Sequence, residues 1–388
     1  MSLSECPISA TSTLEPVFDM RDVPVICNQL WPDRDSAKTA PVADIDLVVC
    51  TETGLVFNRA FDAAILDYGP GYENALHFSP KFQAFADALV AGLVERHGLK
   101  GRDVIEIGCG DGHILSLMAQ HGVRRATGFD PTMAGVETPF TAAENVTIEP
   151  AYFTAAHLNT PFDAILCRHV LEHLSAPMDL LTEIRRAVGD RPVPVYFEVP
   201  NAGWMLDTVS MWDVIYEHVT YWTADSAEAL FRRAGFRPTS IREGYGGQFL
   251  MIEAMPAAPQ PGWVSPTLDR TLAAARSFGA KSNAELDGWR DKLRASTGGV
   301  AIWGAGSKGI TFANALGVDG ARLRVLVDVN TRKHGKYVPG VGLPVVAPAD
   351  LSKHGVDLVL ISNSRYEDEI RRSVQEMALY PDFGLIAG

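Results

Sequence analysis

The sequence predicts a three-part α/β protein, and three observations lead to that class. Helical and strand patterns alternate through the middle of the chain, which is typical of a parallel sheet covered by helices. A proline-rich stretch, AMPAAPQPGWVSP, then interrupts the pattern as a stiff linker. After it, GVAIWGAGSKG opens a second strand, turn and helix. We therefore expect a small lobe at residues 1–75, a central domain at 76–255, and a linker helix with a Rossmann-like domain at 256–388.

Composition and charge limit the function classes. The chain has 388 residues, and 47% of them are hydrophobic, which is enough for two or three domains with full cores. A net charge of -13 at pH 7 opposes binding to a nucleic acid backbone. The five scattered cysteines and the absence of a leader or a membrane-length apolar run predict a reduced, cytoplasmic protein. We expect a small-molecule substrate and neither a nucleic acid nor a membrane as partner.

The N-terminal part, residues 1–75, is expected to be a small lobe with little helix. It is rich in proline and aspartate, and its apolar runs, such as IDLVVC, are short. These features are typical of irregular or β-rich structure.

The strongest chemical motif is DVIEIGCGDGHIL. Its apolar start, Val104 to Ile107, predicts a buried strand, and Gly108, Gly110 and Gly112 predict a tight turn before a helix. Residues without a side chain let a ligand lie against the backbone.

Two acids flank this turn. Asp130 ends a second predicted strand, RATGFD, 20 residues after Gly110, where a carboxylate can accept both hydroxyls of a ribose. Glu106, at the end of the first strand, suits a cationic cofactor such as a sulfonium amino acid better than a pyrophosphate. A dehydrogenase would also fit the glycine turn in part, so the choice between the two kinds of cofactor depends on the following segment.

That segment contains a third strand, Ala164 to Cys167, followed by RHVLEHL and a helix. With EIGCGDG and Asp130, it resembles the class I S-adenosylmethionine-dependent methyltransferases. The resemblance implies that the three glycines approach the methionine part of the cofactor, that Asp130 holds its ribose, and that residues around His169 border it. Glu172 and His173 are expected to be structural, because LEHL occurs where a helix packs beside the sheet.

A narrower resemblance covers most of the chain. The stretches VYFEVPNAGWMLDTVSMWDVIYEHVTYWT, GYGGQF and AIWGAGSKGITFANALGV are similar to sugar C-methyltransferases that act on nucleotide-linked 4-keto-deoxysugars. That family joins a small zinc lobe, a methyltransferase core and a C-terminal Rossmann-like lobe. The resemblance implies methyl transfer from S-adenosylmethionine to a carbon next to the ketone of such a sugar.

The segment IYEHVTYWT would supply the chemistry. Methylating carbon requires removal of a proton next to a carbonyl, and an imidazole suits that step. The resemblance places this base at His218. Its neighbour Glu217 could orient the imidazole or a sugar hydroxyl, and Tyr216 could donate a hydrogen bond to the enolate oxygen. Tyr72, in DYGPGYENALHFS, loosely matches an active-site tyrosine of the N-terminal lobe.

The chain departs from the family at the zinc lobe, where two Cys-x-x-Cys pairs supply four ligands. The corresponding pairs here are Cys6 with Ser9 and Cys50 with Thr53, so each pair lacks one thiolate. Cys27 could supply a third ligand, but nothing supplies a fourth. We expect no zinc and no other metal. The segment before the Glu-His pair is also one residue shorter than the family pattern, which affects the substrate prediction.

The C-terminal domain contains a second glycine pattern. Gly304-x-Gly306-x-x-Gly309 follows a strand, and Asp328 lies 19 residues after Gly309, which is the spacing of a dinucleotide-binding unit. Our hypothesis is that Lys308, Gly306 and the adjacent helix N-terminus help to hold the substrate's diphosphate. A degenerate structural domain and NAD binding are the alternatives.

Two other functions remain open at this stage. An O- or N-methyltransferase acting on another small metabolite would use the same cofactor domain, with His218 deprotonating a hydroxyl. A silent methyltransferase-like scaffold would keep the fold without the chemistry. The intact glycine turn, Asp130 and His218 argue against the scaffold.

Overall fold

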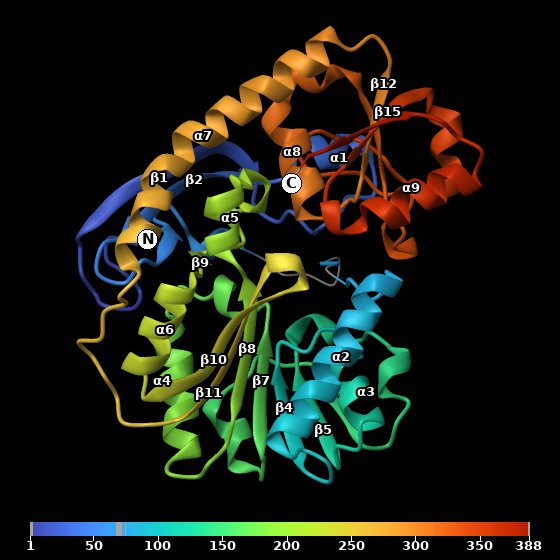
Figure 1. Ribbon diagram of the computed structural model, residues 1–388. Coiled ribbons are helices and arrows are strands. Elements are labelled where there is room, and N and C mark those ends of the chain that lie inside the picture. The colour runs from blue at the N-terminus through green and yellow to red at the C-terminus, as the bar shows by residue number, and fades with distance from the viewer. Residues whose placement is uncertain (1–2, 67–71, 74, 387–388) are drawn as a thin grey trace.

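The computed structural model describes residues 3–66, 72–73 and 75–386, and in these residues the strands form three sheets (Figure 1). The central sheet has seven strands in the order β10-β11-β8-β7-β4-β5-β6. Its strands are β4 (Asp103–Ile107), β5 (Arg125–Phe129), β6 (Val146–Glu149), β7 (Ala164–Arg168), β8 (Val195–Pro200), β10 (Phe236–Gly244) and β11 (Phe249–Pro256). All strands from β6 to β8 are parallel, whereas β11 runs antiparallel to both of its neighbours. This arrangement confirms the predicted class I methyltransferase core with a Rossmann-like sheet.

Helices cover the central sheet, so its inner strands have no exposed face. Every residue of β4 is buried, as expected for a parallel strand covered on both sides. The helices of this domain are α2 (Pro80–His97), α3 (His113–Gln120), α4 (Pro177–Val188), α5 (Ala202–Thr208) and α6 (Ala224–Arg233). The sequence sets the ends of α2 clearly, because the Ser79 side chain caps its N-terminus and Gly98 adopts a left-handed conformation at its C-terminus.

The N-terminal lobe is an antiparallel sheet that takes one strand from the central domain. Its own strands are β1 (Leu14–Pro24), β2 (Val42–Cys50) and β3 (Val56–Asn58), and the fourth is β9 (Thr220–Tyr221). Val56 pairs with Tyr221, and the Asn58 N–H donates to the Val219 carbonyl at 2.8 Å. The segment that carries His218 is therefore attached to the N-terminal lobe.

The C-terminal domain is a parallel sheet in the order β14-β13-β12-β15-β16. Its elements are β12 (Gly299–Trp303), α8 (Ser307–Leu316), β13 (Leu323–Val327), β14 (Val345–Val346), β15 (Val356–Ile361), α9 (Glu367–Glu376) and β16 (Asp382–Leu385). The N-terminal lobe also reaches this domain, where Trp31 and Tyr337 exchange backbone hydrogen bonds at 2.9 and 2.8 Å. The short helix α1 (Arg34–Lys38) follows that contact.

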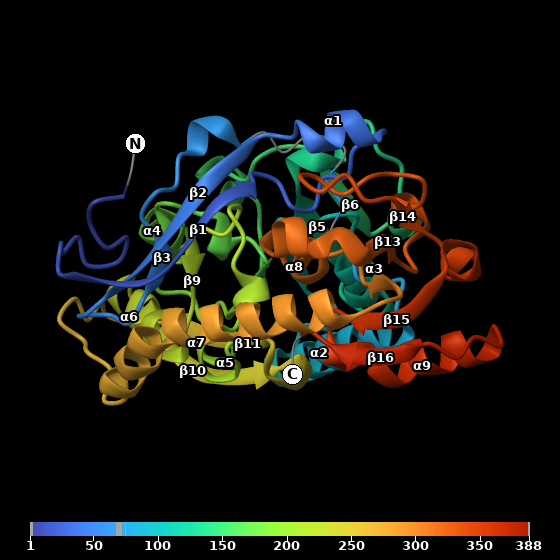
Figure 2. The same cartoon turned by 90° about the horizontal axis from the view of Figure 1, so that it is seen from above.

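The linker helix α7 (Leu268–Ala295) runs across the molecule from the N-terminal lobe to the C-terminal domain, as both ribbon views show (Figures 1 and 2). Phe278 packs edge-on against Phe18 of β1 with ring centroids 5.6 Å apart. At Gly279 the helix lies so close to β1 that an added Cβ would sit 2.5 Å from the Val17 carbonyl oxygen. A glycine is required at this crossing.

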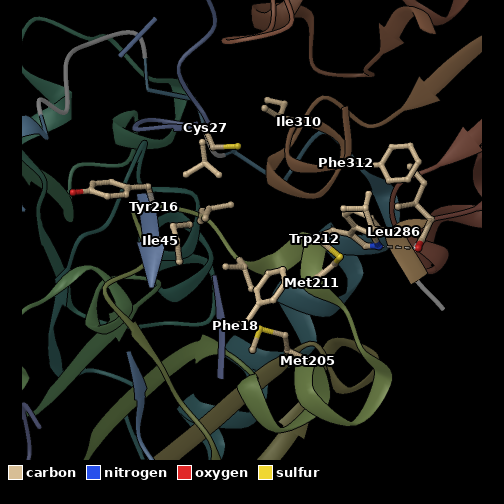
Figure 3. Close-up of a cluster of buried hydrophobic side chains, with 14 of the residues drawn as sticks. Phe18, Cys27, Ile45, Met205, Met211, Trp212, Tyr216, Leu286, Ile310 and Phe312 are labelled. Carbon is tan, nitrogen blue, oxygen red and sulfur yellow. Dashed lines mark hydrogen bonds between the residues drawn. The ribbon is translucent and has the colours of Figure 1, made fainter. Parts of the chain in front are cut away.

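One hydrophobic core joins the three parts of the chain. Trp212 is fully buried at its centre; its indole N–H donates to the Ile386 carbonyl at 3.0 Å, and its ring packs against Phe312 at 4.9 Å. Labelled members of this core in Figure 3 include Phe18, Ile45, Met205, Trp212, Leu286, Ile310 and Phe312. Because these side chains come from all three parts, the lobes share one packed interior.

Among the residues that the structure describes, no helix is both long enough and apolar enough to cross a membrane.

Candidate active site

A cavity of about 1080 Å³ lies where the three parts of the chain meet. The central domain lines it with the carboxyl ends of β4, β5 and β7, which is the usual ligand position in an open α/β sheet. Asn28 and Tyr72 line it from the N-terminal lobe, and the turn after β12 lines it from the C-terminal domain. Arg332 connects these walls, because its guanidinium lies 3.3 Å from Glu73 and 3.4 Å from Asp111.

The first glycine turn has the conformation that the sequence predicted. Gly108, Gly110 and Gly112 all have positive φ angles. A Cβ at Gly108 would lie 2.1 Å from the side chain of Val170, whereas the space beside Gly110 is open. Asp130 holds the turn by accepting a hydrogen bond from the Gly110 N–H at 2.8 Å. Gly108, Gly110 and Asp130 line the cavity, so the backbone there is available to a ligand.

Glu106 is a buried acid with one unused oxygen. The residue is 1% exposed, it lines the cavity, and its Oε2 has no hydrogen-bond partner among the described residues. Burial raises the pKa of this carboxyl to about 8, and the nearby acids Glu198 and Asp130 add to the effect while Arg168 opposes it. An orphaned acid beside an open glycine turn fits a cationic ligand such as a sulfonium.

His169 lies in a charged network with Glu172 and Glu198. Its ring nitrogens are 3.5 Å from Glu172 and 3.2 Å from Glu198, and Arg168 is 2.6 Å from the same Glu198 oxygen. Burial disfavours the charged imidazole, but the two carboxylates outweigh it and raise the pKa of His169 to about 9. Its φ angle of 53° turns the chain at the end of β7, so the ring packs against Phe249 at the cavity wall.

His218 lines the cavity from the segment IYEHVTYWT. Burial and the neighbouring His173 lower the pKa of His218 to about 3, so the imidazole is neutral at pH 7. The rings of His173 and His218 lie 5.1 Å apart, and the Nδ1 of His173 is 2.9 Å from the Glu217 carbonyl. One donor atom each from Glu172, His173 and His218 lies within 4.8 Å of the others, a spacing at which a divalent cation could bind.

Two neighbours of His218 face other directions. Glu217 is fully buried, and its carboxylate accepts hydrogen bonds from the backbone N–H groups of Cys27 at 3.0 Å and Asn28 at 3.5 Å. The Tyr216 hydroxyl accepts from the Asp62 N–H at 2.8 Å. The cavity is lined by Ile215 and His218 but not by Tyr216 or Glu217. The catalytic roles predicted for these two residues therefore have no support from the geometry, which gives both a structural position.

The wall opposite the acids is basic. Lys308 and Gly306, the residues of the diphosphate hypothesis, line it, but the Lys308 ammonium forms an ion pair with Asp213 and lies over the Trp204 ring at 4.9 Å. The sequence analysis missed Lys336, which lines the same wall and has no ion-pair partner in the described part of the chain. The basic run NTRKHGK directly after the strand end at Asp328 was the available signal.

The four residues at the family's zinc positions come together in the structure. Cys6 Sγ lies 3.4 Å from Thr53 Oγ1, and Ser9 Oγ lies 3.7 Å from Cys50 Sγ. Cys27 is elsewhere, 3.8 Å from the Ser307 carbonyl oxygen. Structural zinc sites use four thiolate or imidazole ligands. Two thiols and two hydroxyls do not fit that requirement, so these residues do not form the family's zinc site.

Comparison with known proteins finds similarity to methyltransferases. A model described as a methyltransferase domain matches residues 81–241, and one described as a C-methyltransferase C-terminal domain matches 275–380. The chain is 26% identical to C-methyltransferase NovU of Streptomyces niveus over 95% of this chain and 91% of that protein. It is 32% identical to a ubiquinone biosynthesis O-methyltransferase of Alkalilimnicola ehrlichii over 24% of this chain and 39% of that protein.

Among solved structures, magnesium protoporphyrin IX methyltransferase from Synechocystis PCC 6803 with bound SAH aligns with a TM-score of 0.35 and 17% identity. That alignment covers 46% of this chain and 84% of the other. The two matched domains, the full-length relative and the strand order lead to one conclusion. The chain contains a class I S-adenosylmethionine-dependent methyltransferase domain, with S-adenosylmethionine as its methyl donor, followed by a domain similar to the C-terminal domain of C-methyltransferases.

Proposed function

We propose that the protein methylates the carbon next to the ketone of a nucleotide-linked deoxysugar. The observation that carries this proposal is the position of His218, a neutral imidazole in a cavity with an acidic wall and a basic wall. The acidic wall suits a sulfonium and the basic wall suits a diphosphate. A base that lies between the acidic wall and the basic wall would be close to the acceptor carbon of the sugar.

On the acidic side, Gly108, Gly110, Asp130 and Glu106 would hold S-adenosylmethionine. When bound, this cofactor supplies an electrophilic methyl group on a positively charged sulfur. Glu106 would ionise beside that charge, because a nearby cation opposes the effect of burial on the carboxyl pKa. His169 would close this side of the cavity.

On the acceptor side, His218 would take a proton from the carbon next to the ketone. The electron pair of the broken C–H bond would form the enolate, and that carbon would attack the methyl group in line. Tyr72 lines the cavity and stays a candidate for hydrogen bonding to the sugar. Walls from three lobes would keep water away from the enolate.

The diphosphate would lie against the C-terminal domain. The N-terminus of α8 supplies unpaired backbone N–H groups behind Gly306. Since Asp213 already balances the charge of Lys308, we add Lys336 to the residues that would hold the anion.

The test is transfer of a labelled methyl group from S-adenosylmethionine to a panel of nucleotide-linked 4-keto-deoxysugars, with NMR locating the new methyl. The proposal predicts a carbon-bound methyl next to the ketone. A methyl on oxygen or nitrogen would favour the alternative, in which the enzyme modifies a heteroatom of another small metabolite. No product from any sugar, with intact cofactor binding, would reject the sugar substrate.

A further inference from the structure

The N-terminal lobe holds two thiols in a paired arrangement that methyl transfer does not use. Cys6 and Cys50 each begin a tight turn: the Ala10 N–H donates to the Cys6 carbonyl at 2.9 Å, and the Gly54 N–H donates to the Cys50 carbonyl at 2.9 Å. The two turns face each other, so that each thiol contacts the hydroxyl carried by the opposite turn, Thr53 at 3.4 Å and Ser9 at 3.7 Å.

We propose that Cys6 and Cys50 are a redox-active pair that forms an intramolecular disulfide with a small peroxide. The pair lies in the core between the N-terminal lobe and the central domain, where Cys6 is 2% and Cys50 0% exposed. Oxidants larger than hydrogen peroxide would be excluded by this burial. Cys6 contacts the turn that carries Cys50, and Cys50 contacts the turn that carries Cys6, so no backbone rearrangement between lobes is required to bring them together.

Electrostatics assign the two thiols different roles. The Cys6 thiol and the hydroxyls of Thr53 and Ser9 donate hydrogen bonds to Cys50, which lowers the pKa of Cys50 to about 5 although burial opposes the shift. The pKa of Cys6 is raised, first by its hydrogen bond with Cys50 and then by burial. Cys50 is therefore the nucleophile, since the thiolate is the reactive form, and Cys6 is the resolving thiol.

The other cysteines lack this arrangement. Burial raises the pKa of Cys27, Cys109 and Cys167, and none of them has a second thiol among its described contacts. Without a partner thiol nearby, these cysteines are not expected to form an intramolecular disulfide.

The reaction balances with peroxide as the oxidant. The Cys50 thiolate attacks one peroxide oxygen and breaks the O–O bond, giving a sulfenic acid and, after proton uptake, one water. The Cys6 sulfur then attacks the Cys50 sulfur and displaces a second water. Overall the two thiols lose two hydrogens and two electrons, and a dithiol reductant reverses the change.

The disulfide would affect the segment that carries His218. Cys50 ends β2, and the turn after it leads into β3, which pairs with β9 two residues beyond His218. A covalent bond at Cys50 fixes this hairpin to the N-terminal residues. We therefore expect the oxidised form to have a higher Tm than the reduced form.

The test is oxidation of the full-length protein with a small excess of hydrogen peroxide, followed by digestion without reductant and mass spectrometry. A peptide linking Cys6 to Cys50, lighter by two hydrogens and split by dithiothreitol, is the expected product. Cys27→Ser, a buried cysteine of the same lobe, should give the same linked peptide. In Cys6→Ser the link should be absent, and dimedone added with denaturant after the peroxide step should trap Cys50 as the sulfenic acid.

A second variant tests the mechanism without removing a sulfur. Thr53→Val removes, at nearly constant volume, a hydroxyl that contacts Cys6 at 3.4 Å and helps to lower the pKa of Cys50, and it should slow Cys50 oxidation several-fold while the disulfide still forms. Wild-type protein in which Cys50 stays unmodified, or is linked to another cysteine, would overturn the proposal. An unchanged rate in Thr53→Val would overturn the assignment of Cys50 as the activated thiol.

Discussion

The chain contains two glycine turns that share a backbone design and differ in their surroundings. Each follows a buried parallel strand, opens a helix and is held by a carboxylate from the end of the next strand. Asp130 accepts from the Gly110 N–H at 2.8 Å, and Asp328 accepts from the Ala305 N–H at 2.9 Å. From the sequence pattern alone, both turns suit a nucleotide-containing cofactor.

The charges around the two turns are opposite. On the side of the first turn the cavity is lined by the acids Glu106 and Glu172, whereas on the side of the second it is lined by Lys308, Lys333 and Lys336. Lys333 also lies 3.4 Å from Asp328, so the carboxylate that would hold a cofactor ribose is already paired. The comparison teaches that the glycine pattern gives access to the backbone, while neighbouring side chains select the charge of the ligand.

The largest expected difference between the turns appears when a glycine of each is replaced by alanine. In Gly108→Ala the new Cβ would lie 2.1 Å from the Val170 side chain, and the backbone would keep a φ of 68° that a residue with a side chain rarely adopts. The backbone strain and the displacement of Val170 should together cost about 3 kcal/mol, or roughly 100-fold in S-adenosylmethionine affinity. Gly306 has an extended backbone with open space beside it, so Gly306→Ala should leave that affinity unchanged. Calorimetric titration of both folded variants checks this, and equal losses would contradict the assignment.

A second difference is the pH dependence of cofactor binding. The pKa of Glu106 is raised to about 8, so without ligand the carboxyl is protonated below that pH and must lose its proton beside a sulfonium. Affinity for S-adenosylmethionine should therefore rise roughly tenfold per pH unit toward pH 8 and then level off. Neutral S-adenosylhomocysteine is the matched control and should show little change. Glu106→Gln should remove the pH dependence of S-adenosylmethionine affinity. If the pH dependence persists in that variant, another titrating group causes it.

Loss of one cation from the second turn should have a smaller effect. Lys336→Ala should raise the KM for the sugar nucleotide about tenfold, the scale of one charge-assisted contact, and leave the dissociation constant of S-adenosylmethionine unchanged. Lys353→Ala is the control, because that exposed lysine pairs with Asp350. Steady-state kinetics at two salt concentrations provide the measurement. An unchanged KM would remove Lys336 from the anion site.

The smallest expected effect concerns NAD. Since the Asp328 carboxylate is paired with Lys333, titration of NAD into the full-length protein should show no saturable binding at millimolar concentration. Tight, saturable binding would restore the cofactor interpretation of the second turn.

Much of the fold and of the cofactor half of the site could be predicted from the sequence. The turn at Gly108 and the acid at Asp130 are local features, fixed by one strand, one turn and a constant spacing. The direction of Tyr216 and Glu217 could not be predicted, because they lie in an irregular turn with no periodicity to define a face. Their positions depend on Asp62 and on the backbone of residues 27–28, far away in sequence.

The pairing of Lys308 with Asp213 was missed for a similar reason. The two residues are 95 positions apart, and their contact exists only because α8 packs against the turn at Met211–Asp213. The two-residue strand β9 is likewise too short to give a sequence pattern, although it decides how the His218 segment is held.

The central claim is that His218 removes a proton from carbon between the two turns. The direct measurement is exchange of the acceptor's C–H next to the ketone in deuterated solvent, followed by NMR with S-adenosylhomocysteine in the cofactor site. We predict exchange with wild-type protein, and its loss in His218→Asn together with a fall in turnover of roughly 100-fold. Exchange at the wild-type rate in folded His218→Asn would contradict the account.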